Sequence, residues 1–223
     1  MTELKFVEHG ALKNPKYLVI FLHGYGANGE NLLSLHHEFS HVLPESHYIS
    51  PHGVEPWEGG FPDSYQWFSL NGGLGRNTLE QISESIKNSN KILGNFIDSQ
   101  LARFNLSYEN LFIVGFSQGG MMSIYQGLIQ KKQPAGIISF SGKLIMPEMI
   151  GEKTLSKPNI CLVHGKQDSV VPFENFLEAE KILKSHNFNF ESHAVDHLDH
   201  SIDIHGVKYA QNFIKKLINQ KNI

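Results

Sequence analysis

Short apolar runs alternate along the chain with longer segments whose apolar residues recur every three or four positions. The short runs are typical of buried strands, and the longer segments are typical of helices with one apolar face. On this pattern we expect strands at residues 16–22, 48–50, 111–114, 137–140, 160–163 and 188–195. We expect helices at residues 30–43, 78–104, 119–130, 173–185 and 207–218.

The longest predicted helix, at residues 78–104, has the clearest pattern: its apolar residues Ile82, Ile86, Leu93, Ile97, Leu101 and Phe104 recur with a period near 3.6. Thr78 and Gln81 have the spacing of a capping box at its start. Strands that alternate with helices indicate an α/β protein, with a mostly parallel central sheet and helices on both faces. Such a sheet carries functional groups in the loops at the carboxyl ends of its strands.

One connection, residues 51–77, is much longer than the others and is rich in glycine, proline and aromatic residues. Long loops in compact domains are usually functional or disordered, and so many aromatic residues argue against disorder. The loop either covers a sheet edge or walls an apolar pocket. In the second case we expect the pocket to be lined by Trp57, Phe61, Trp67, Phe68, Leu70 and Leu74. Each buried CH₂ contributes about 0.8 kcal/mol, so specificity would then rise with the length of a bound apolar chain.

Composition narrows the class of protein. A length of 223 residues fits one domain, residues 1–223. The net charge is -3 and no basic run exceeds two residues, which argues against nucleic-acid binding. The apolar stretch at residues 17–22 is too short to span a bilayer, and the first residues lack a signal pattern, so we expect a cytoplasmic protein without an integral membrane segment. The single cysteine, Cys161, lies in an apolar run and is expected in the core.

A candidate nucleophile lies between a predicted strand and a predicted helix. Gly115-Phe116-Ser117-Gln118-Gly119 matches the pattern G-x-S-x-G, in which a tight turn presents the serine and requires small residues two positions to either side. The N–H of Gln118, at the start of the helix, is then free to bind an oxyanion. An ordinary glycine-rich turn, with Ser117 as a helix cap, is the alternative.

The loop after the first predicted strand offers a second oxyanion donor. In α/β-hydrolases this loop supplies a backbone N–H to the oxyanion hole. Here the loop begins His23-Gly24-Tyr25-Gly26, and the N–H of Tyr25 is the candidate. We expect His23 to hold the loop by hydrogen bonds rather than to accept a proton.

A serine nucleophile needs a base and an orienting acid, which in α/β-hydrolases follow in the order serine, acid, histidine. Asp168 lies between a predicted strand and a predicted helix, where the acid is expected. After the last predicted strand, both His197 and His200 qualify as the base. A metal site formed by His193, His197 and His200 is a rival interpretation, although this spacing matches no common zinc signature.

The sequence resembles the phospholipase/carboxylesterase family of α/β-hydrolases, which includes the acyl-protein thioesterases. The resemblance rests on five collinear blocks that extend over nearly the whole chain: Phe21-Leu22-His23-Gly24-Tyr25-Gly26, Trp67-Phe68, Gly115-Phe116-Ser117-Gln118-Gly119-Gly120, His164-Gly165-Lys166-Gln167-Asp168-Ser169-Val170-Val171-Pro172 and His200-Ser201-Ile202.

The resemblance implies Ser117 as nucleophile, Asp168 as orienting acid and His200 rather than His197 as base, with Tyr25 and Gln118 as backbone donors. The family often has glycine before this histidine, and here that residue is Asp199. A carboxylate beside His200 could raise the pKa of His200 or compete for its ring N–H.

For function, these observations imply a carboxylesterase that cleaves ester or thioester bonds through an acyl-enzyme, without a metal or organic cofactor. Members of the family act on small acyl esters, lysophospholipids or acylated protein cysteines, and the sequence does not choose among these substrates. It is also compatible with a homodimer. A binding module that keeps an apolar pocket without chemistry is the alternative class, and an intact Ser117, Asp168 and His200 set argues against it.

Overall fold

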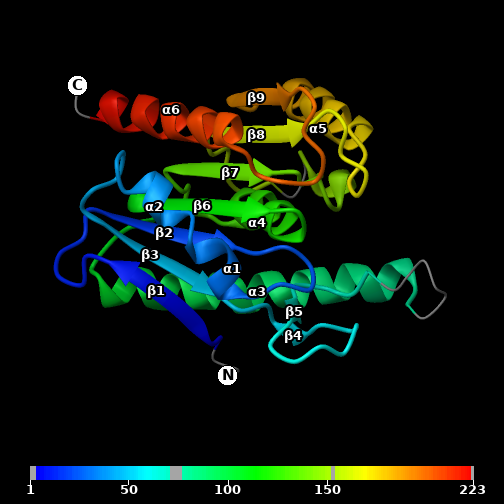
Figure 1. Ribbon diagram of the computed structural model, residues 1–223, viewed down its shortest axis with the longest axis horizontal. Helices are drawn as coiled ribbons and strands as arrows, with labels where there is room; N and C mark the ends of the chain where they lie inside the picture. The colour runs from blue at the N-terminus through cyan, green and yellow to red at the C-terminus, as the bar shows by residue number, and fades with distance from the viewer. Residues whose placement is uncertain (1–3, 71–76, 152–153, 222–223) are drawn as a thin grey trace.

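A seven-stranded sheet forms the centre of the molecule. The computed structural model describes residues 4–70, 77–151 and 154–221 (Figure 1). The sheet has the order β1-β3-β2-β6-β7-β8-β9, in which β1 pairs antiparallel to β3 and every other pair is parallel. The strands are β1 (Phe6–Gly10), β2 (Tyr17–Leu22), β3 (Ser46–Pro51), β6 (Leu111–Phe116), β7 (Gly136–Phe140), β8 (Ile160–Gly165) and β9 (Phe190–Val195).

Helices cover both faces of this sheet. They are α1 (Gly29–Leu33), α2 (His36–Phe39), α3 (Leu79–Arg103), α4 (Gln118–Ile129), α5 (Glu174–Ser185) and α6 (Ile204–Lys221), with short 3₁₀ turns at Tyr108–Asn110 and Pro147–Met149. Apolar residues of α3, α4 and α5 pack on one face, and those of α6 and the α1–α2 region pack on the other. The predicted α/β architecture with a mostly parallel sheet is therefore confirmed.

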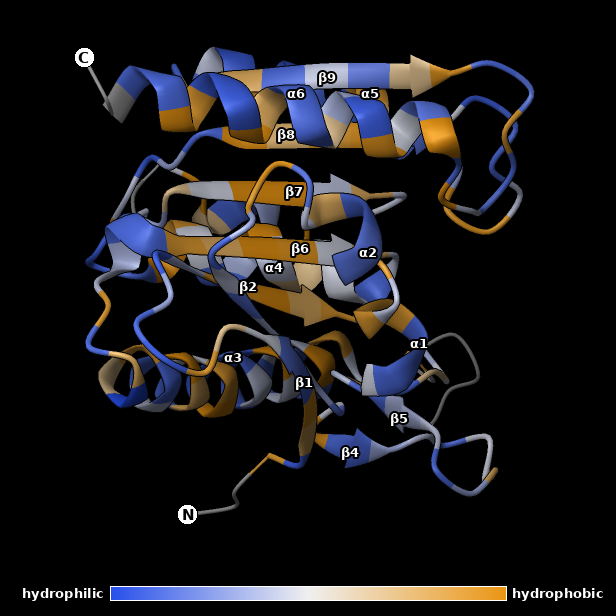
Figure 2. Ribbon diagram, turned by 60° about the vertical axis from the view of Figure 1, so that its left-hand side comes forward, coloured by the Kyte–Doolittle hydropathy of each residue, from blue (hydrophilic) through white to orange (hydrophobic). Residues whose placement is uncertain are grey.

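The alternation of side chains along each strand produces the two cores. In β2, Leu18, Ile20 and Leu22 belong to the cluster beneath α3, and the residues between them, Val19 and Phe21, belong to the cluster beneath α6. All five are fully buried. A strand covered on both faces needs apolar residues at every position, which explains the continuous apolar runs in the sequence. Figure 2 shows these runs as orange bands along the central strands.

The long helix α3 forms as its sequence predicts. The Thr78 side chain accepts from the N–H of Gln81, and the Gln81 side chain accepts from the N–H of Thr78, so the expected capping box is present. Ile86, Leu93 and Ile97 are buried against the sheet. The helix therefore begins and ends within one residue of the predicted range.

Three local features differ from the predictions. The segment expected as one helix at residues 30–43 is two short helices, α1 and α2. The edge strand β1 was not predicted, because none of its residues is fully buried and no apolar run marks it. The long loop contains a small antiparallel ladder, β4 (Glu55–Pro56) with β5 (Tyr65–Gln66), too short to give a sequence signal.

Two predictions from composition can be compared with the structure. Cys161 is completely buried in β8, which confirms its place in the core. Within the described ranges, none of the helices has the length and apolar character needed to cross a membrane.

Candidate active site

Ser117 lies at the sharp turn that joins β6 to α4. Its φ of 53° and ψ of -118° are strained for a residue with a side chain, and its N–H donates to the carbonyl oxygen of Phe140 over 2.9 Å. A Cβ at Gly115 would lie 2.1 Å from the carbonyl oxygen of Gly119, and one at Gly119 would lie 1.9 Å from that of Leu22. Both positions therefore require glycine for the turn to close.

Two backbone N–H groups beside Ser117 are free to bind an anion. Tyr25, in the loop after β2, and Gln118, the first residue of α4, both line the same cavity as Ser117. Neither backbone N–H donates to an acceptor among the described residues. The next amide in the loop, that of Gly26, is taken by the carbonyl oxygen of Tyr65 at 2.9 Å.

Side chains fix both of these donor residues in place. The Gln118 amide oxygen accepts from Trp67 N–H at 2.8 Å, and its Nε2 donates to the Phe68 carbonyl oxygen at 2.6 Å. The Tyr25 hydroxyl donates to Glu58. The pKa of Tyr25 is raised to about 12, mainly by burial and to a smaller extent by this hydrogen bond. The long loop therefore braces the turn that carries Ser117 and the loop that carries Tyr25.

His23 begins that second loop and is neutral. Its side chain is buried, and burial lowers its pKa to about 4. Its Nδ1 lies 2.7 Å from the carbonyl oxygen of Gly24, and its own carbonyl oxygen accepts from the Trp67 indole N–H at 2.9 Å. These contacts agree with a role in holding the loop.

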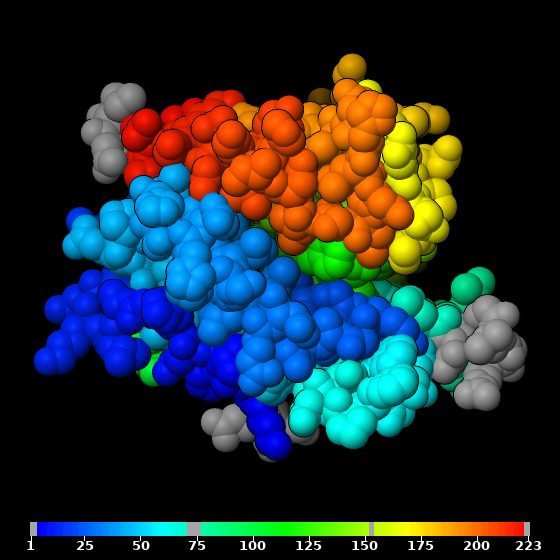
Figure 3. All heavy atoms as spheres, viewed as in Figure 1, coloured from blue at the N-terminus to red at the C-terminus, as the bar shows by residue number. Residues whose placement is uncertain are grey.

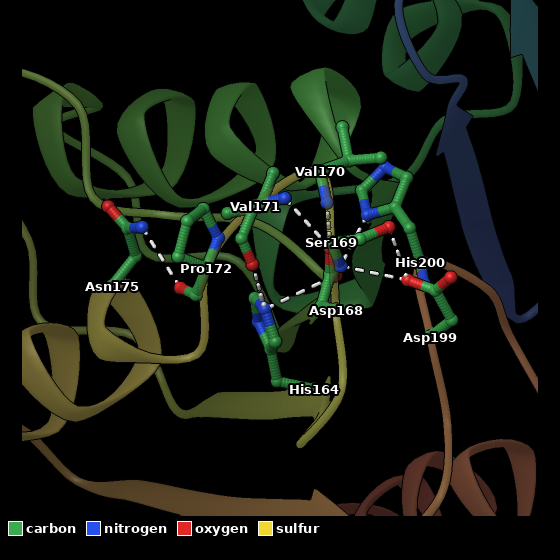
Figure 4. A network of polar contacts seen from close by, with 9 residues as sticks. All are labelled: His164, Asp168, Ser169, Val170, Val171, Pro172, Asn175, Asp199 and His200. Atoms are coloured by element: carbon green, nitrogen blue, oxygen red, sulfur yellow. Dashed lines mark hydrogen bonds and ion pairs between the residues drawn. The ribbon is translucent and has the colours of Figure 1, made fainter.

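Asp168 and His200 meet at the carboxyl ends of β8 and β9 (Figure 4). His200 Nδ1 lies 2.8 Å from Asp168 Oδ2. The other carboxylate oxygen of Asp168 accepts from the N–H groups of Val170, at 3.0 Å, and Val171, at 2.7 Å. A carboxylate held by two backbone donors is fixed in orientation, and it fixes the ring of His200 in turn.

Asp168 is ionised although its side chain is inaccessible to solvent. Burial acts to raise its pKa, but the hydrogen bonds from His200, Val171 and Val170 outweigh it and hold the pKa below the ordinary value. A second histidine, His164, lies 3.3 Å from the same Oδ2 and donates from Nε2 to the Val171 carbonyl oxygen at 2.8 Å. Burial lowers the pKa of His164, so this ring stays neutral. The sequence marked His164 only as part of a family block.

Asp199 does not compete for the ring of His200. Its Oδ1 accepts from the N–H and the hydroxyl of Ser169, both at 2.8 Å, and from the backbone N–H of His200, also at 2.8 Å. These bonds tie the loop after β9 to the loop after β8 (Figure 4). The ring of His200 is thus paired with Asp168, and Asp199 bonds to the His200 backbone instead.

Ser117, His200, Tyr25 and Gln118 line one cavity of about 700 Å³. Among the described residues no direct hydrogen bond joins the Ser117 hydroxyl to the His200 ring. In Figure 3, green atoms from the middle of the chain are visible between the blue N-terminal segment below and the orange and yellow C-terminal segments above. Further walls that the sequence did not reveal come from Leu32, Leu35, Met121, Lys143, Val170, Asn175 and Ile202.

The predicted acyl pocket requires a correction. Of the residues expected to line it, Leu70 does, and Leu74 lies outside the described residues. Trp67 and Phe68 are instead buried in the core beneath α3. Trp57 stacks on Phe61 and meets the Tyr25 ring edge-on, so neither residue faces the cavity. Trp67 and Phe68 therefore pack in the core, while Trp57 and Phe61 stack on each other and Phe61 stays largely exposed.

The rival metal site does not assemble. The His193 ring stacks on Tyr209 with ring centroids 4.0 Å apart, His197 contacts Gln167, and His200 contacts Asp168. Within residues 4–70, 77–151 and 154–221, no three histidine, cysteine, aspartate or glutamate side chains are grouped closely enough to hold a metal ion.

Comparisons with known proteins identify the family of the chain. The profile of the family described as Phospholipase/Carboxylesterase matches residues 3–218. Esterase YpfH of Escherichia coli is 24% identical, with 96% of this chain and 88% of the relative covered. Acyl-protein thioesterase 1 of Neurospora crassa is 25% identical, with 88% of this chain and 84% of the relative covered. The crystal structure of esterase PE8 superposes with a TM-score of 0.89 at 29% identity, covering 97% of this chain and 100% of that one.

The match over nearly the full chain and the esterase-like fold lead to one assignment. The chain belongs to the phospholipase/carboxylesterase family of α/β-hydrolases and is a carboxylic ester hydrolase.

Proposed function

We propose that the protein hydrolyses ester or thioester bonds of acyl substrates, with Ser117 as nucleophile, His200 as general base and Asp168 as the acid that orients it. One observation carries the proposal: Ser117, His200 and two unengaged backbone N–H groups line a single cavity, while buried Asp168 holds the His200 ring. The three side chains come from loops after β6, β8 and β9, in the order expected for this fold.

The hydrogen bond to Asp168 determines what His200 can do. With Nδ1–H donating to Asp168 Oδ2, the lone pair of His200 is at Nε2, which is then the atom that takes the proton of the Ser117 hydroxyl. The serine oxygen attacks the acyl carbonyl, and the negative charge moves to the carbonyl oxygen. The N–H groups of Tyr25 and Gln118 bind this oxyanion, assisted by the N-terminus of α4.

The remaining steps use the same groups. The tetrahedral intermediate collapses, the carbon–oxygen or carbon–sulfur bond of the leaving group breaks, and protonated His200 delivers its Nε2 proton to the alcohol or thiol. Water then attacks the acyl-Ser117 ester, with His200 as base, and releases the carboxylic acid. The buried anion of Asp168 stabilises the imidazolium in both half-reactions.

The cavity supports acyl substrates of moderate size. A volume of about 700 Å³ lies within the range of small-molecule sites, and Leu32, Leu35, Leu70 and Met121 supply apolar wall. Among the relatives, one is named an esterase and one an acyl-protein thioesterase, so both oxygen and sulfur esters belong in the proposed substrate class.

The test is the loss of the proposed nucleophile. Ser117→Ala should reduce hydrolysis of a short p-nitrophenyl ester by at least about 10⁴-fold, because the covalent route is removed while the turn keeps its shape. Circular dichroism and thermal melting check that the variant is folded. A fluorophosphonate probe should label the wild-type protein at Ser117 and leave the variant unlabelled.

Retained activity in the folded Ser117→Ala variant would contradict the proposed mechanism. A wild-type protein that neither reacts with the probe nor hydrolyses the ester would instead favour a binding module that keeps an apolar pocket.

A further inference from the structure

The cavity that contains Ser117 has an uneven charge distribution. Apart from its histidines, Lys143 is the single residue of the described lining that is charged at neutral pH, and no aspartate or glutamate is part of that lining. The side chain of Lys143 is exposed, and it forms no ion pair or hydrogen bond with another described residue. An ammonium group on an otherwise neutral wall is available to a ligand.

The backbone that carries Lys143 is held tightly against the nucleophile turn. Lys143 follows β7, the strand between β6 and β8 in the sheet. Ser141 has a φ of 48°, and its N–H donates to the Val163 carbonyl oxygen at 2.8 Å. A Cβ at Gly142 would lie 2.4 Å from Ser139 Oγ and 3.0 Å from the carbonyl carbon of Gly120. The loop is thus packed closely against the first turn of α4, and Lys143, the next residue, is part of the cavity lining.

Three carboxylates beside residues of this cavity already have hydrogen-bond partners. Glu58 accepts from the hydroxyls of Tyr25 and Ser69 and from the N–H of Leu70. Asp168 is buried behind His200, and Asp199 accepts from Ser169 and from the His200 backbone. None of these carboxylates is part of the described cavity lining, so the groups on that lining which favour a bound anion are the Lys143 ammonium and the N-terminus of α4.

We propose that Lys143 is a specificity-determining residue that binds an anionic group on the substrate, so that the preferred substrates are esters or thioesters that carry a carboxylate or phosphate away from the scissile bond. This inference rests on the proposed function, because it concerns the same cavity. The anion is either on the acyl chain or on the leaving group, since the cavity receives both parts of the substrate. Lys143 takes no part in bond making or breaking.

The experiment compares esters that differ only in charge. Phenyl hydrogen glutarate carries the anion on its acyl chain, and phenyl 5-methylhexanoate is a neutral substrate of nearly the same shape. For the leaving group, the matched pair is 4-carboxyphenyl pentanoate and 4-isopropylphenyl pentanoate. The measured quantity is the ratio of kcat/KM for the anionic ester to kcat/KM for the neutral ester. Dividing the wild-type ratio by the ratio for Lys143→Met gives a double ratio. In this double ratio, differences in intrinsic reactivity between the two esters cancel.

We expect this double ratio to be roughly fivefold in at least one pair at low ionic strength, the upper end for an exposed ion pair. It should fall towards one as salt is added, because salt screens the ammonium. Lys143→Arg should keep most of the preference, and Lys143→Glu should reverse it. Lys132→Met is the control, because Lys132 follows the opposite end of α4 from Ser117 and should leave both ratios unchanged.

The pair that shows the effect identifies which side of the ester carries the anion. A double ratio near one in both pairs would overturn the proposal, as would an unchanged ratio in Lys143→Glu. Failure of the proposed mechanism is recognised separately: it would appear as activity in Ser117→Ala, whereas failure of the anion preference leaves Ser117-dependent activity on the neutral esters intact.

Discussion

Asp168 combines two properties that rarely occur together, full burial of its side chain and a negative charge. Three N–H groups, from Val170, Val171 and His200, make this charge stable. Because the backbone donors occupy one oxygen, only the other oxygen can face His200. Asp168 therefore determines both the direction of the His200 ring and the nitrogen that carries its proton.

Replacing Asp168 by Asn tests this role of the carboxylate. The Asn amide oxygen would keep the bonds from Val170 and Val171, so its NH₂ would face His200 Nδ1 and favour a proton on Nε2, which is the wrong tautomer for a base. We expect kcat to fall about 10⁴-fold with little change in fold. Steady-state kinetics and circular dichroism measure the two effects.

Asp199→Asn is the matched control, because an amide oxygen can still accept from Ser169 and from the His200 backbone. It should lose far less activity than Asp168→Asn. If the two variants lost activity equally, the separate roles assigned to these neighbouring carboxylates would be wrong.

At the scale of elements, the edge strand β1 is joined to α3 through one carboxylate. Glu8 accepts from Arg103 Nη1 at 2.6 Å and Nη2 at 3.0 Å, and it lies 3.0 Å from His47 Nε2 on β3. The Arg103 hydrogen bonds are the largest cause that lowers the pKa of Glu8 to about 2. A strand without fully buried residues thus gains polar contacts in place of apolar ones.

Glu8→Gln should reduce the free energy of unfolding at pH 7 by about 1 kcal/mol, a value that allows for partial solvent screening. A depressed pKa stabilises the folded state above the unfolded-state pKa, and this contribution is lost as pH falls from about 4.5 towards about 2. The difference between wild type and variant in urea denaturation should therefore be smaller at pH 3 than at pH 7. A difference that grew on acidification would contradict the assignment.

The turn between β6 and α4 has no space for added atoms. Gly119→Ala would place a methyl group against the Leu22 backbone, so β2 and α4 would have to separate. We expect a loss of several kcal/mol in unfolding free energy, or failure to fold, since overpacking against backbone cannot relax easily. Thermal melting measures the effect.

Gly94→Ala provides the comparison for a buried glycine. The three atoms nearest to a methyl group there are side-chain atoms of Gln130 and Gln126 rather than backbone atoms, and alanine is the better helix former. The melting temperature of this variant should stay close to that of wild type. Equal destabilisation by both substitutions would show that the loss reflects burial in general and not the tightness of the turn.

Much of this architecture could be predicted from the sequence, because strands buried on both faces and a capped, periodic helix have strong local patterns. Ser117 and Asp168 could be located because each follows such a strand. The residues of the cavity wall could not be located from the sequence. Leu32, Val170 and Ile202, for example, come from separate segments and become neighbours only through the fold. Sequence pattern also could not show that the described aromatic residues of the long loop stay off the cavity wall, because it cannot distinguish rings that pack on one another from rings that face a ligand.

At the scale of the whole molecule, the parallel sheet gathers the site. Strands β2, β6, β7, β8 and β9 are consecutive neighbours, and the loop after each one carries, in that order, Tyr25, Ser117, Lys143, Asp168 and His200. Parallel strands end at the same edge, so residues far apart in sequence meet there. The site therefore exists only when these five strands are paired.

Cys161 reports on this pairing without perturbing it. It lies within β8 with no exposed surface, and burial raises the pKa of its thiol well above the ordinary value. We expect no reaction with a disulfide reagent such as DTNB in the native protein at neutral pH, and one thiol equivalent after denaturation. Rapid labelling of the native protein would show that the centre of the sheet opens readily. Labelling in increasing urea should follow the loss of esterase activity.

The positive φ of Ser117 has a consequence for how this position evolves. A serine at a φ of 53° carries a strain of about 1–3 kcal/mol that glycine, which accepts positive φ freely, would avoid. Only the reaction gives a reason to keep a side chain there, because stability alone favours its removal. In a lineage that had ceased to hydrolyse esters, mutation and selection for folding would act together to replace this serine. Position 117 would then record, in any descendant sequence, whether the chemistry is still under selection.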